Sequence, residues 1–390
     1  MKITVTILIF FLLHYSRYSQ GIIESNNKIA FKVYKQLNQT EQNIVFSPFS
    51  ISSAVAMTYI GARNSTFNEI SNTFYFNKNI KEFSESYKNY FGFKINPKSA
   101  VQFYNANSLW IQQGLILESD FIRLNKEYFS ASLNFVDFTA DPDNSRILIN
   151  SWVEKNTNNK ISDLLKPSSI DEATQLILVN ALYFNGTWKS KFIKEKNTKA
   201  DFQVAKRYFV QTEYMNRSIN TWYFENKYFQ IVDLPYENDE YALMIILPKS
   251  YRKLKKVEKT LSNEFYNSYI SNKEKRRVNL SLPKFQIDSE FDLNKTLFDL
   301  GIKEAFTGAA NFSGISEEEK LYISKVVQKA TISIDEEGTE AAAATAISMR
   351  KTSVLLKNAD LKINRPFIYI IRNTYNNCIY FIGKVSNPKE

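Results

Sequence analysis

The spacing of apolar residues predicts helices in the first part of the chain. Over residues 28–37, apolar side chains recur at three- and four-residue intervals, the period of an amphipathic helix. The segment SPFSISSAVAMTYIGA follows, and Gly61 is placed to end a helix there. Residues 147–165, around Trp152, predict a longer helix. We therefore expect the chain to begin with packed helices.

Strand patterns dominate the later part. TQLILVNALYF and YALMIILP are near-continuous apolar runs, which are typical of strands buried on both faces. LYISKVVQKATISID alternates over much of its length, and FIYIIRN and CIYFIGKV flank TYNN as in a hairpin. Helices followed by strands indicate a mixed α+β fold class. No Gly/Ser/Pro-rich linker and no internal repeat is present, so we expect one continuous domain.

The first 21 residues have the pattern of a secretory signal peptide. Lys2 gives a charged start, an apolar core follows over residues 3–13, and the small-residue rule places cleavage after Gly21. The apolar core is too short to span a membrane. We therefore expect a secreted, extracellular and soluble domain over residues 22–390, about 369 residues long.

The counts of reactive residues exclude several enzyme classes. The only histidine, His14, lies in the predicted signal, so the mature chain cannot use Ser-His-Asp or Cys-His catalysis and lacks the usual zinc ligands. The single Cys378 allows no internal disulfide. No dinucleotide or phosphate loop is present, so we expect no cofactor and no metal. A hydrolase based on two carboxylates remains open as a remote alternative.

The chain is basic, with a net charge of +10 that becomes +8 without Lys2 and Arg17. If residues 252–259 are helical, four cations share one face; they are Arg252, Lys255, Lys256 and Lys259. This face is a candidate site for a heparin-like glycosaminoglycan, although a solvated helix face is the simpler interpretation. NKEKRR, near Arg276, is a second basic patch with the same two interpretations. Nothing resembles a nucleic-acid-binding module.

Seven N-x-S/T sequons occur, and a secreted chain would carry glycan on some of them. Asn185 and Asn279 lie among apolar strand residues and are the weakest candidates. The expected acceptors are Asn38, Asn64, Asn216, Asn294 and Asn311.

Five segments, in order, resemble the serpin superfamily and together cover nearly the whole mature chain. They are NIVFSPFSISSAVAMTYIGA, VNALYFNGTWKSKF, LSLPKFQIDSEFDLNKTLFDLGIKEAF, DEEGTEAAAAT and INRPFIYIIRNTYNNCIYFIGKVSNP. The resemblance implies three β-sheets, about eight or nine helices and an exposed reactive loop over about residues 336–362. It also implies inhibition as a suicide substrate: a protease cuts the loop, stays acylated, and is carried away as the loop inserts into the main sheet.

The segment EEGTEAAAATAISMRKTS, residues 336–353, fits this double role. Its polar, glycine-led start suits a loop, and its later residues suit a strand. On insertion, side chains alternate between the two faces, so Thr339 would point inward and Glu340 outward. The resemblance identifies a hinge of small residues without proline, which favours an inhibitory member; it comprises Glu336, Glu337, Gly338, Thr339, Glu340, Ala341, Ala342, Ala343, Ala344 and Thr345.

The resemblance also assigns residues that control opening of the sheet. Trp188 would lie beneath the point where the loop begins to insert, and Asn180 would bond backbone as the sheet opens. Ser47 and Ser50 match nearby helix positions. Gln328 stands where the family commonly has histidine; because an amide both donates and accepts hydrogen bonds, we expect a rewired network rather than a lost one.

The reactive bond is expected among Arg350, Lys351, Thr352 and Ser353. Register along the family's usual loop gives Thr352–Ser353, which suits an elastase-like enzyme. Cutting after Lys351 gives a trypsin-like enzyme the cation that its pocket requires, and we favour this bond. The predicted function is therefore a monomeric inhibitor of an extracellular serine protease. The alternatives are a non-inhibitory binding or carrier serpin, or an inhibitor of elastase-like or cysteine proteases.

Overall fold

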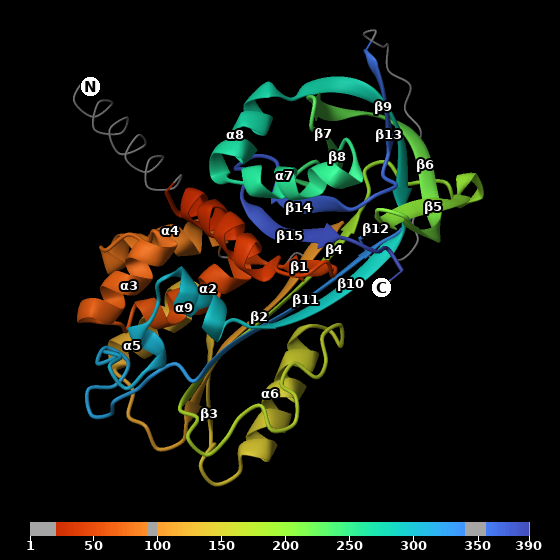
Figure 1. The fold of residues 1–390 in the computed structure, drawn as a ribbon. Helices are drawn as coiled ribbons and strands as arrows, with labels where there is room; N and C mark the ends of the chain where they lie inside the picture. The colour runs from red at the N-terminus through yellow and green to blue at the C-terminus, as the bar shows by residue number, and fades with distance from the viewer. Residues whose placement is uncertain (1–20, 92–99, 340–355, 390) are drawn as a thin grey trace, which may run out of the picture.

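The computed structural model describes residues 21–91, 100–339 and 356–389 (Figure 1). Nine α-helices occur in these ranges: residues 21–37, α2 (Pro48–Tyr59), α3 (Asn64–Phe74), α4 (Ile80–Phe91), α5 (Ser119–Leu124), α6 (Pro142–Asn156), α7 (Leu254–Thr260), α8 (Asn263–Asn272) and α9 (Asn294–Leu300). The mixed α+β class is confirmed.

The strands of the described residues form two sheets. The six-stranded sheet has the order β10 (Phe285–Asp292), β11 (Lys325–Ile334), β12 (Gly338–Thr339), β4 (Leu176–Thr187), β2 (Val101–Gln112) and β3 (Ser132–Val136). The nine-stranded sheet has the order β1 (Ile44–Phe46), β15 (Ile379–Val385), β14 (Phe367–Asn373), β8 (Tyr241–Pro248), β7 (Phe229–Pro235), β6 (Tyr208–Glu225), β9 (Glu274–Pro283) and β13 (Asn358–Lys362), with β5 (Thr198–Ala205) beside β6.

The strands fall into the groups that a serpin fold implies, but β6 joins two of these groups into one connected nine-stranded sheet. β6 is 18 residues long and pairs with β9 from Tyr214 to Tyr223. On its other edge it pairs with β5 as far as Tyr214 and with β7 from Tyr223 onward. One strand therefore belongs to two groups of partners. The nine-stranded sheet forks between Tyr214, the last residue of β6 that pairs with β5, and Tyr223, the first that pairs with β7.

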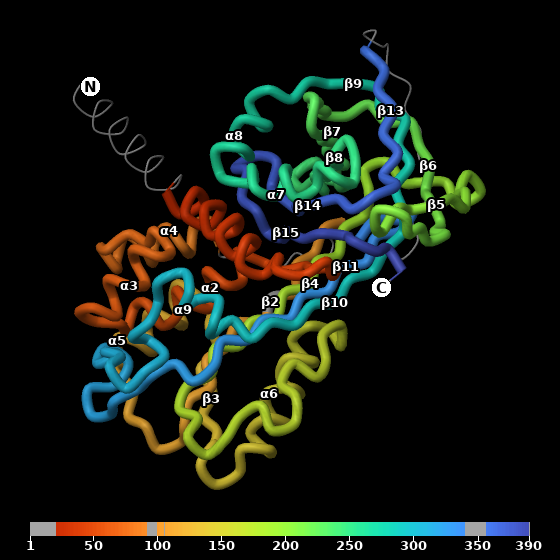
Figure 2. Tube along the Cα trace, viewed as in Figure 1, coloured from red at the N-terminus to blue at the C-terminus, as the bar shows by residue number. Residues whose placement is uncertain are grey.

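The main core lies between the two sheets and the helices of the amino-terminal half. β8, β14 and β15 are buried along their whole length, as near-continuous apolar runs predict. α2 packs against β4 and β15, and a smaller apolar cluster lies under α6, including Ile149 and Val153. In Figure 2 the traces of β4, β10 and β11 run alongside one another. Cys378 is fully buried within the main core and forms no disulfide.

Most element predictions are confirmed, and two are wrong in extent. Residues 28–37, α2, β4, β8 and the β14–β15 hairpin appear where the apolar patterns place them. The helix predicted over residues 147–165 is α6, which begins at Pro142 and ends at Asn156. It ends there because Asn158 and Asn159 take the left-handed conformation, which ordinary helices do not continue. Residues 358–362 of the expected reactive loop belong to β13. Within the described ranges, no helix is both long and apolar enough to cross a membrane.

Candidate functional site: the end of the six-stranded sheet

The hinge enters the six-stranded sheet at one end. Over most of their length β4 and β11 pair directly and in parallel, from Ile177 with Lys325 to Tyr183 with Thr331. Beyond this point β12 lies between them, pairing with Ile334 of β11 and with Gly186 and Thr187 of β4. The two residues of β12 therefore lie at one end of the boundary along which β4 and β11 pair, here called the β4–β11 seam. The two strands would have to separate further along this seam to admit a longer strand.

Thr339 is fully buried, as the inward face of an inserting strand requires. Its hydroxyl is 2.6 Å from the hydroxyl of Tyr236. The Tyr236 ring stacks on Trp188 with ring centroids 4.7 Å apart. A small polar side chain is thus hydrogen-bonded within an aromatic pocket, where an unpartnered hydroxyl would be costly.

Trp188 lies beneath the hinge and holds its backbone. The indole Nε1 donates to the carbonyl of Asp335 over 2.9 Å, and the Trp188 amide donates to the carbonyl of Glu337 over 2.9 Å. The Asp335 carboxylate accepts from the amides of Glu337 and Gly338, which bends the chain into β12. Burial raises the pKa of Asp335 above its usual value, although these two amide bonds oppose the shift.

Gly338 is required by close approach of two backbones. A Cβ atom at this position would lie 2.0 Å from the carbonyl oxygen of Gly186 and 2.9 Å from the Cα of Thr187. Because the opposing atoms belong to the main chain, no neighbouring side chain could rotate away to relieve this contact. The position therefore admits β12 into the sheet only as glycine.

Two lysines fix the polar side of the hinge. Glu336 forms an ion pair with Lys284 at 2.6 Å, and Glu337 forms one with Lys191 at 2.6 Å. Burial alone would raise the pKa of Glu336, but hydrogen bonds from Lys284 and Asn197 leave it below its usual value. The Glu336 side chain is only 12% exposed, so this pair is better shielded than an ordinary surface ion pair.

Gln328 joins β11 to the start of α2. Its Oε1 accepts from the Ser47 amide at 3.1 Å, and its Nε2 donates to the Ser47 carbonyl at 2.9 Å. The Ser47 side chain is also the N-cap of α2 and accepts from the Ser50 amide. The amide of Gln328 therefore satisfies both main-chain groups of one buried residue, and its hydrogen bonds do not titrate.

Asn180 stands opposite Gln328 across the β4–β11 seam, because the two residues are register partners. Its side chain turns the other way and donates to Asn107 of β2. The hydroxyl of Ser50 and the Oδ1 atom of Asn180 are buried without a hydrogen-bond partner among the described residues. Each strand of the seam is thus tied by its side chain to a different neighbour, and none of these bonds crosses the seam.

Sequence reasoning missed part of this arrangement. Tyr236, Lys284, Lys191 and Asn107 come from segments whose patterns indicate only buried or basic strand positions. Their roles depend on contacts with residues 52 or more positions away in sequence, so no local signal identifies them. The hinge residues Glu340, Ala341, Ala342, Ala343, Ala344 and Thr345 and the reactive-bond residues Arg350, Lys351, Thr352 and Ser353 lie outside the described residues.

The basic face is exposed, although it is not one continuous α-helix. Residues 251–253 form a 3₁₀ turn before α7. Arg252, Lys255, Lys256 and Lys259 are exposed, while Leu254 and Val257 point into the core. Lys255 pairs with Glu41 at 3.4 Å, in a fully solvated geometry.

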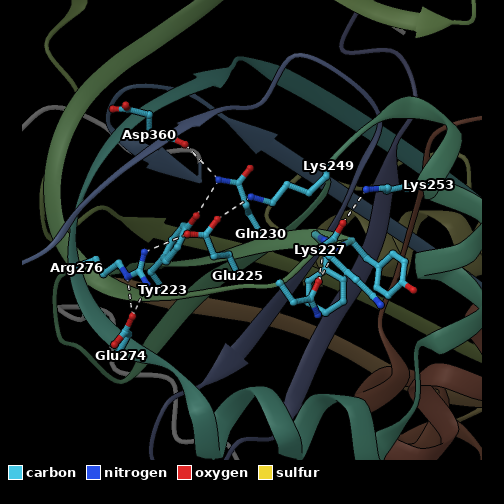
Figure 3. Close-up of polar contacts among 12 residues, drawn as sticks. Tyr223, Glu225, Lys227, Gln230, Lys249, Lys253, Glu274, Arg276 and Asp360 are labelled. Carbon is cyan, nitrogen blue, oxygen red and sulfur yellow. Dashed lines mark hydrogen bonds and ion pairs between the residues drawn. The ribbon is translucent and has the colours of Figure 1, made fainter.

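Tyr228 extends this basic face. The ammonium groups of Lys227, Lys253 and Lys256 lie 5.1, 5.8 and 4.2 Å from its ring centroid. By contrast, Figure 3 shows Lys249 and Arg276 both reaching Glu225, at 2.6 and 3.1 Å. The NKEKRR patch is thus partly neutralised, whereas the lysines around Tyr228 have no carboxylate within ion-pair distance in the described ranges.

The sequons differ in how accessible their amide nitrogens are. Asn64 is exposed, and Asn38 and Asn311 are half-buried. The Nδ2 atom of Asn216 donates to the Lys196 carbonyl, and that of Asn294 donates to the Ser324 carbonyl. A glycan on either of the last two would replace these bonds. No three metal-ligating side chains lie close enough to hold an ion in the part of the chain that the structure covers.

Comparison with known proteins places this geometry in one family. The family model for serpin (serine protease inhibitor) matches residues 24–388. A serpin-like protein of Methanosarcina acetivorans is 35% identical over 95% of this chain and 88% of its own length. Human leukocyte elastase inhibitor is 34% identical over 95% of this chain and all of its own. The solved structure of human thyroxine-binding globulin in complex with thyroxine aligns with a TM-score of 0.86 and 28% identity, over 96% of this chain and all of that one. The chain belongs to the serpin family.

Proposed function

We propose that this serpin is a secreted suicide-substrate inhibitor of trypsin-like serine proteases. The observation that carries the proposal is the burial of Thr339 between β4 and β11. The first inward-facing hinge residue already occupies the position that an inserted strand would take. The next inward-facing residues, Ala341, Ala343 and Thr345, are small, and the charged Glu340 would face outward, so the gap could extend without burying a charge.

In the proposed mechanism, the protease serine attacks the carbonyl carbon of the residue before the cut bond. The peptide bond breaks, the new amino terminus leaves, and an ester joins the inhibitor to the enzyme. The freed hinge then separates β4 from β11 and pairs with both. Hydrolysis of the ester competes with this insertion, so a hinge that enters easily favours a trapped enzyme over a cleaved substrate.

A non-inhibitory carrier is the second candidate. The match to thyroxine-binding globulin supports it, since that protein has the same fold and its structure holds a small molecule. The first candidate, an inhibitor, could also have an elastase-like target. The 34% identity with leukocyte elastase inhibitor supports that target. The small hinge and the buried Thr339 favour the inhibitor over the carrier.

Incubation with a trypsin-like protease should produce an adduct that survives denaturing electrophoresis. Mass spectrometry should find a released carboxy-terminal fragment that begins at Thr352, because Lys351 supplies the cation for the protease pocket. The same protease with its catalytic serine replaced serves as the control and should give neither product. A fragment that begins at Ser353 would support the elastase-like target. Stable adducts with chymotrypsin-like enzymes alone would overturn the choice of trypsin, and cleavage without any adduct would overturn the inhibitor.

Gly338→Ala should convert the inhibitor largely into a substrate, since its Cβ would collide with the Gly186 carbonyl. More chain should be cleaved for each protease molecule trapped, by about 10-fold or more if strand entry slows by over 1.4 kcal/mol. The matched control is Gly308→Ala, where a Cβ would meet no atom within 4 Å. Equal adduct yields from both variants would show that entry of β12 does not limit trapping.

Heparin should accelerate protease association by bridging to the basic face around Tyr228. We expect a several-fold gain that disappears at high salt, because these contacts are between exposed charges. Lys256→Ala should reduce the gain, whereas Lys320→Ala, at an exposed lysine elsewhere, should leave it unchanged. An association rate that stays flat as heparin is added would leave the face as a solvated surface only.

A further inference from the structure

The fork in the nine-stranded sheet opens a cavity of about 1020 Å³. Between the last pair with β5 and the first with β7, residues 215–222 of β6 have no strand partner on that edge among the described strands. The cavity lies against this edge and is also lined by residues of β7, β8, β9, β14 and the end of α8, which lie in the upper half of Figure 1. Its lining residues include neither the hinge residues nor the lysines around Tyr228.

The charges lining the cavity do not balance. Six cations line it, namely Lys189, Arg217, Lys273, Lys275, Arg277 and Arg372, against two carboxylates, Asp233 and Asp239. Lys189 pairs with Asp239, and Asp233 is shared by Arg372 and Lys273. Arg217, Lys275 and Arg277 have no carboxylate within 4 Å in the described part of the chain. The cavity therefore carries a surplus of positive charge that the protein itself does not compensate.

Arg217 is the least compensated of these cations. It is half-buried in β6, and its Nε atom is inaccessible and makes no hydrogen bond with the described residues. Burial lowers the pKa of its guanidinium, and no carboxylate opposes this shift. A half-buried guanidinium with an inaccessible, unpartnered Nε atom is costly to the fold, and an anionic ligand would supply a partner for the group.

Arg372 forms a fixed floor to the cavity. Its guanidinium is fully buried and is held by Asp233 at 2.5 Å and by the side chain of Asn377 at 2.9 Å. Burial alone would lower the pKa of Arg372, but Asp233 and the nearby tyrosines keep it above its usual value. Its Nε atom also lacks a partner among the described residues. The floor is therefore a rigid cation rather than a flexible surface chain.

An aromatic wall completes the cavity. Trp222 is 38% exposed, and it is the register partner of Lys275 across β6 and β9. The ammonium groups of Lys273 and Lys275 lie 5.2 and 5.3 Å from its ring. The indole thus holds two cations at the mouth of the cavity and adds a flat apolar surface beside them.

We propose that this cavity binds a small organic polyanion that carries sulfate or phosphate esters. Several such groups on one compact molecule match cations that line different walls, and guanidinium groups bind tetrahedral oxyanions through paired N–H donors. A cavity whose cations come from several elements suits a compact ligand, whereas the exposed cations on α7 suit a long glycan chain. Both ester types have the same recognition chemistry, so the source of the ligand is decided by experiment.

Isothermal titration of the full chain tests the proposal, with inositol hexakisphosphate as the phosphate probe and sucrose octasulfate as the sulfate probe. At least one should bind and should raise the Tm of the protein as its concentration rises. Binding of the phosphate probe alone would indicate an organic phosphate, and binding of the sulfate probe alone a sulfated sugar. Failure of both would overturn the proposal.

Variants locate the binding. Arg217→Ala should weaken it about 10-fold or more, the worth of a hydrogen bond to a charged group. Its own thermal unfolding checks that it folds, and Arg277→Ala, at an exposed cation of the same cavity, provides a second variant. Lys256→Ala is the control, because Lys256 belongs to the basic face outside the cavity. Affinity lost in Lys256→Ala but kept in Arg217→Ala would overturn the assignment. Protease inhibition plays no part in this test, so its outcome is independent of the proposed function.

Discussion

The parallel hydrogen bonds between β4 and β11 are the constraint on which the rest of this molecule depends. Seven residue pairs, from Ile177–Lys325 to Tyr183–Thr331, close the six-stranded sheet. β12 has already separated the same two strands at one end. The hydrogen bonds of Gln328 and Asn180 run from the seam to α2 and to β2, and so they hold each strand to its own neighbour. The seam can therefore open without breaking either of these bonds, provided that the neighbours move with the strands.

Charge is distributed in three different ways around this frame. At the hinge, Lys284 and Lys191 are matched by Glu336 and Glu337, which holds the entry of β12 in place. Around Tyr228, exposed lysines face solvent and suit a long anionic chain. In the fork beside β6, Arg217 is half-buried, Arg372 is fully buried, and both are incompletely paired, which suits a compact ligand. The surface around Tyr228 and the cavity beside β6 differ more clearly in how far their cations are buried than in how many cations they have.

The sequence predicted elements wherever periodicity was strong. The apolar runs of β4, β8 and β14 and the helical spacing of α2 each fixed one element, because burial on both faces or on one stripe leaves a local pattern. The end of α6 was missed because an asparagine run can continue or end a helix, and only the left-handed Asn158 and Asn159 decide it. The joining of two sheets by β6 has no local signal, since it depends on which strands reach each edge.

The candidate site was predicted in part for the same reason. Family resemblance located Trp188, Gln328 and the hinge, whereas Tyr236 and Lys284 required the three-dimensional contacts. Gln328 shows the limit most clearly: the resemblance pointed to a position where the family commonly has histidine, but only the structure showed both main-chain groups of Ser47 bound by the Gln328 amide.

The most direct test of the central claim is the Tm of the chain before and after cleavage in the reactive loop. If the freed hinge extends β12 along the seam, the cleaved chain gains a buried strand. Ladder hydrogen bonds worth about 1 kcal/mol each should then raise the Tm by more than about 10 °C. An unchanged or lower Tm after complete cleavage would contradict strand insertion, and with it the account of β12 as the start of an inserting strand.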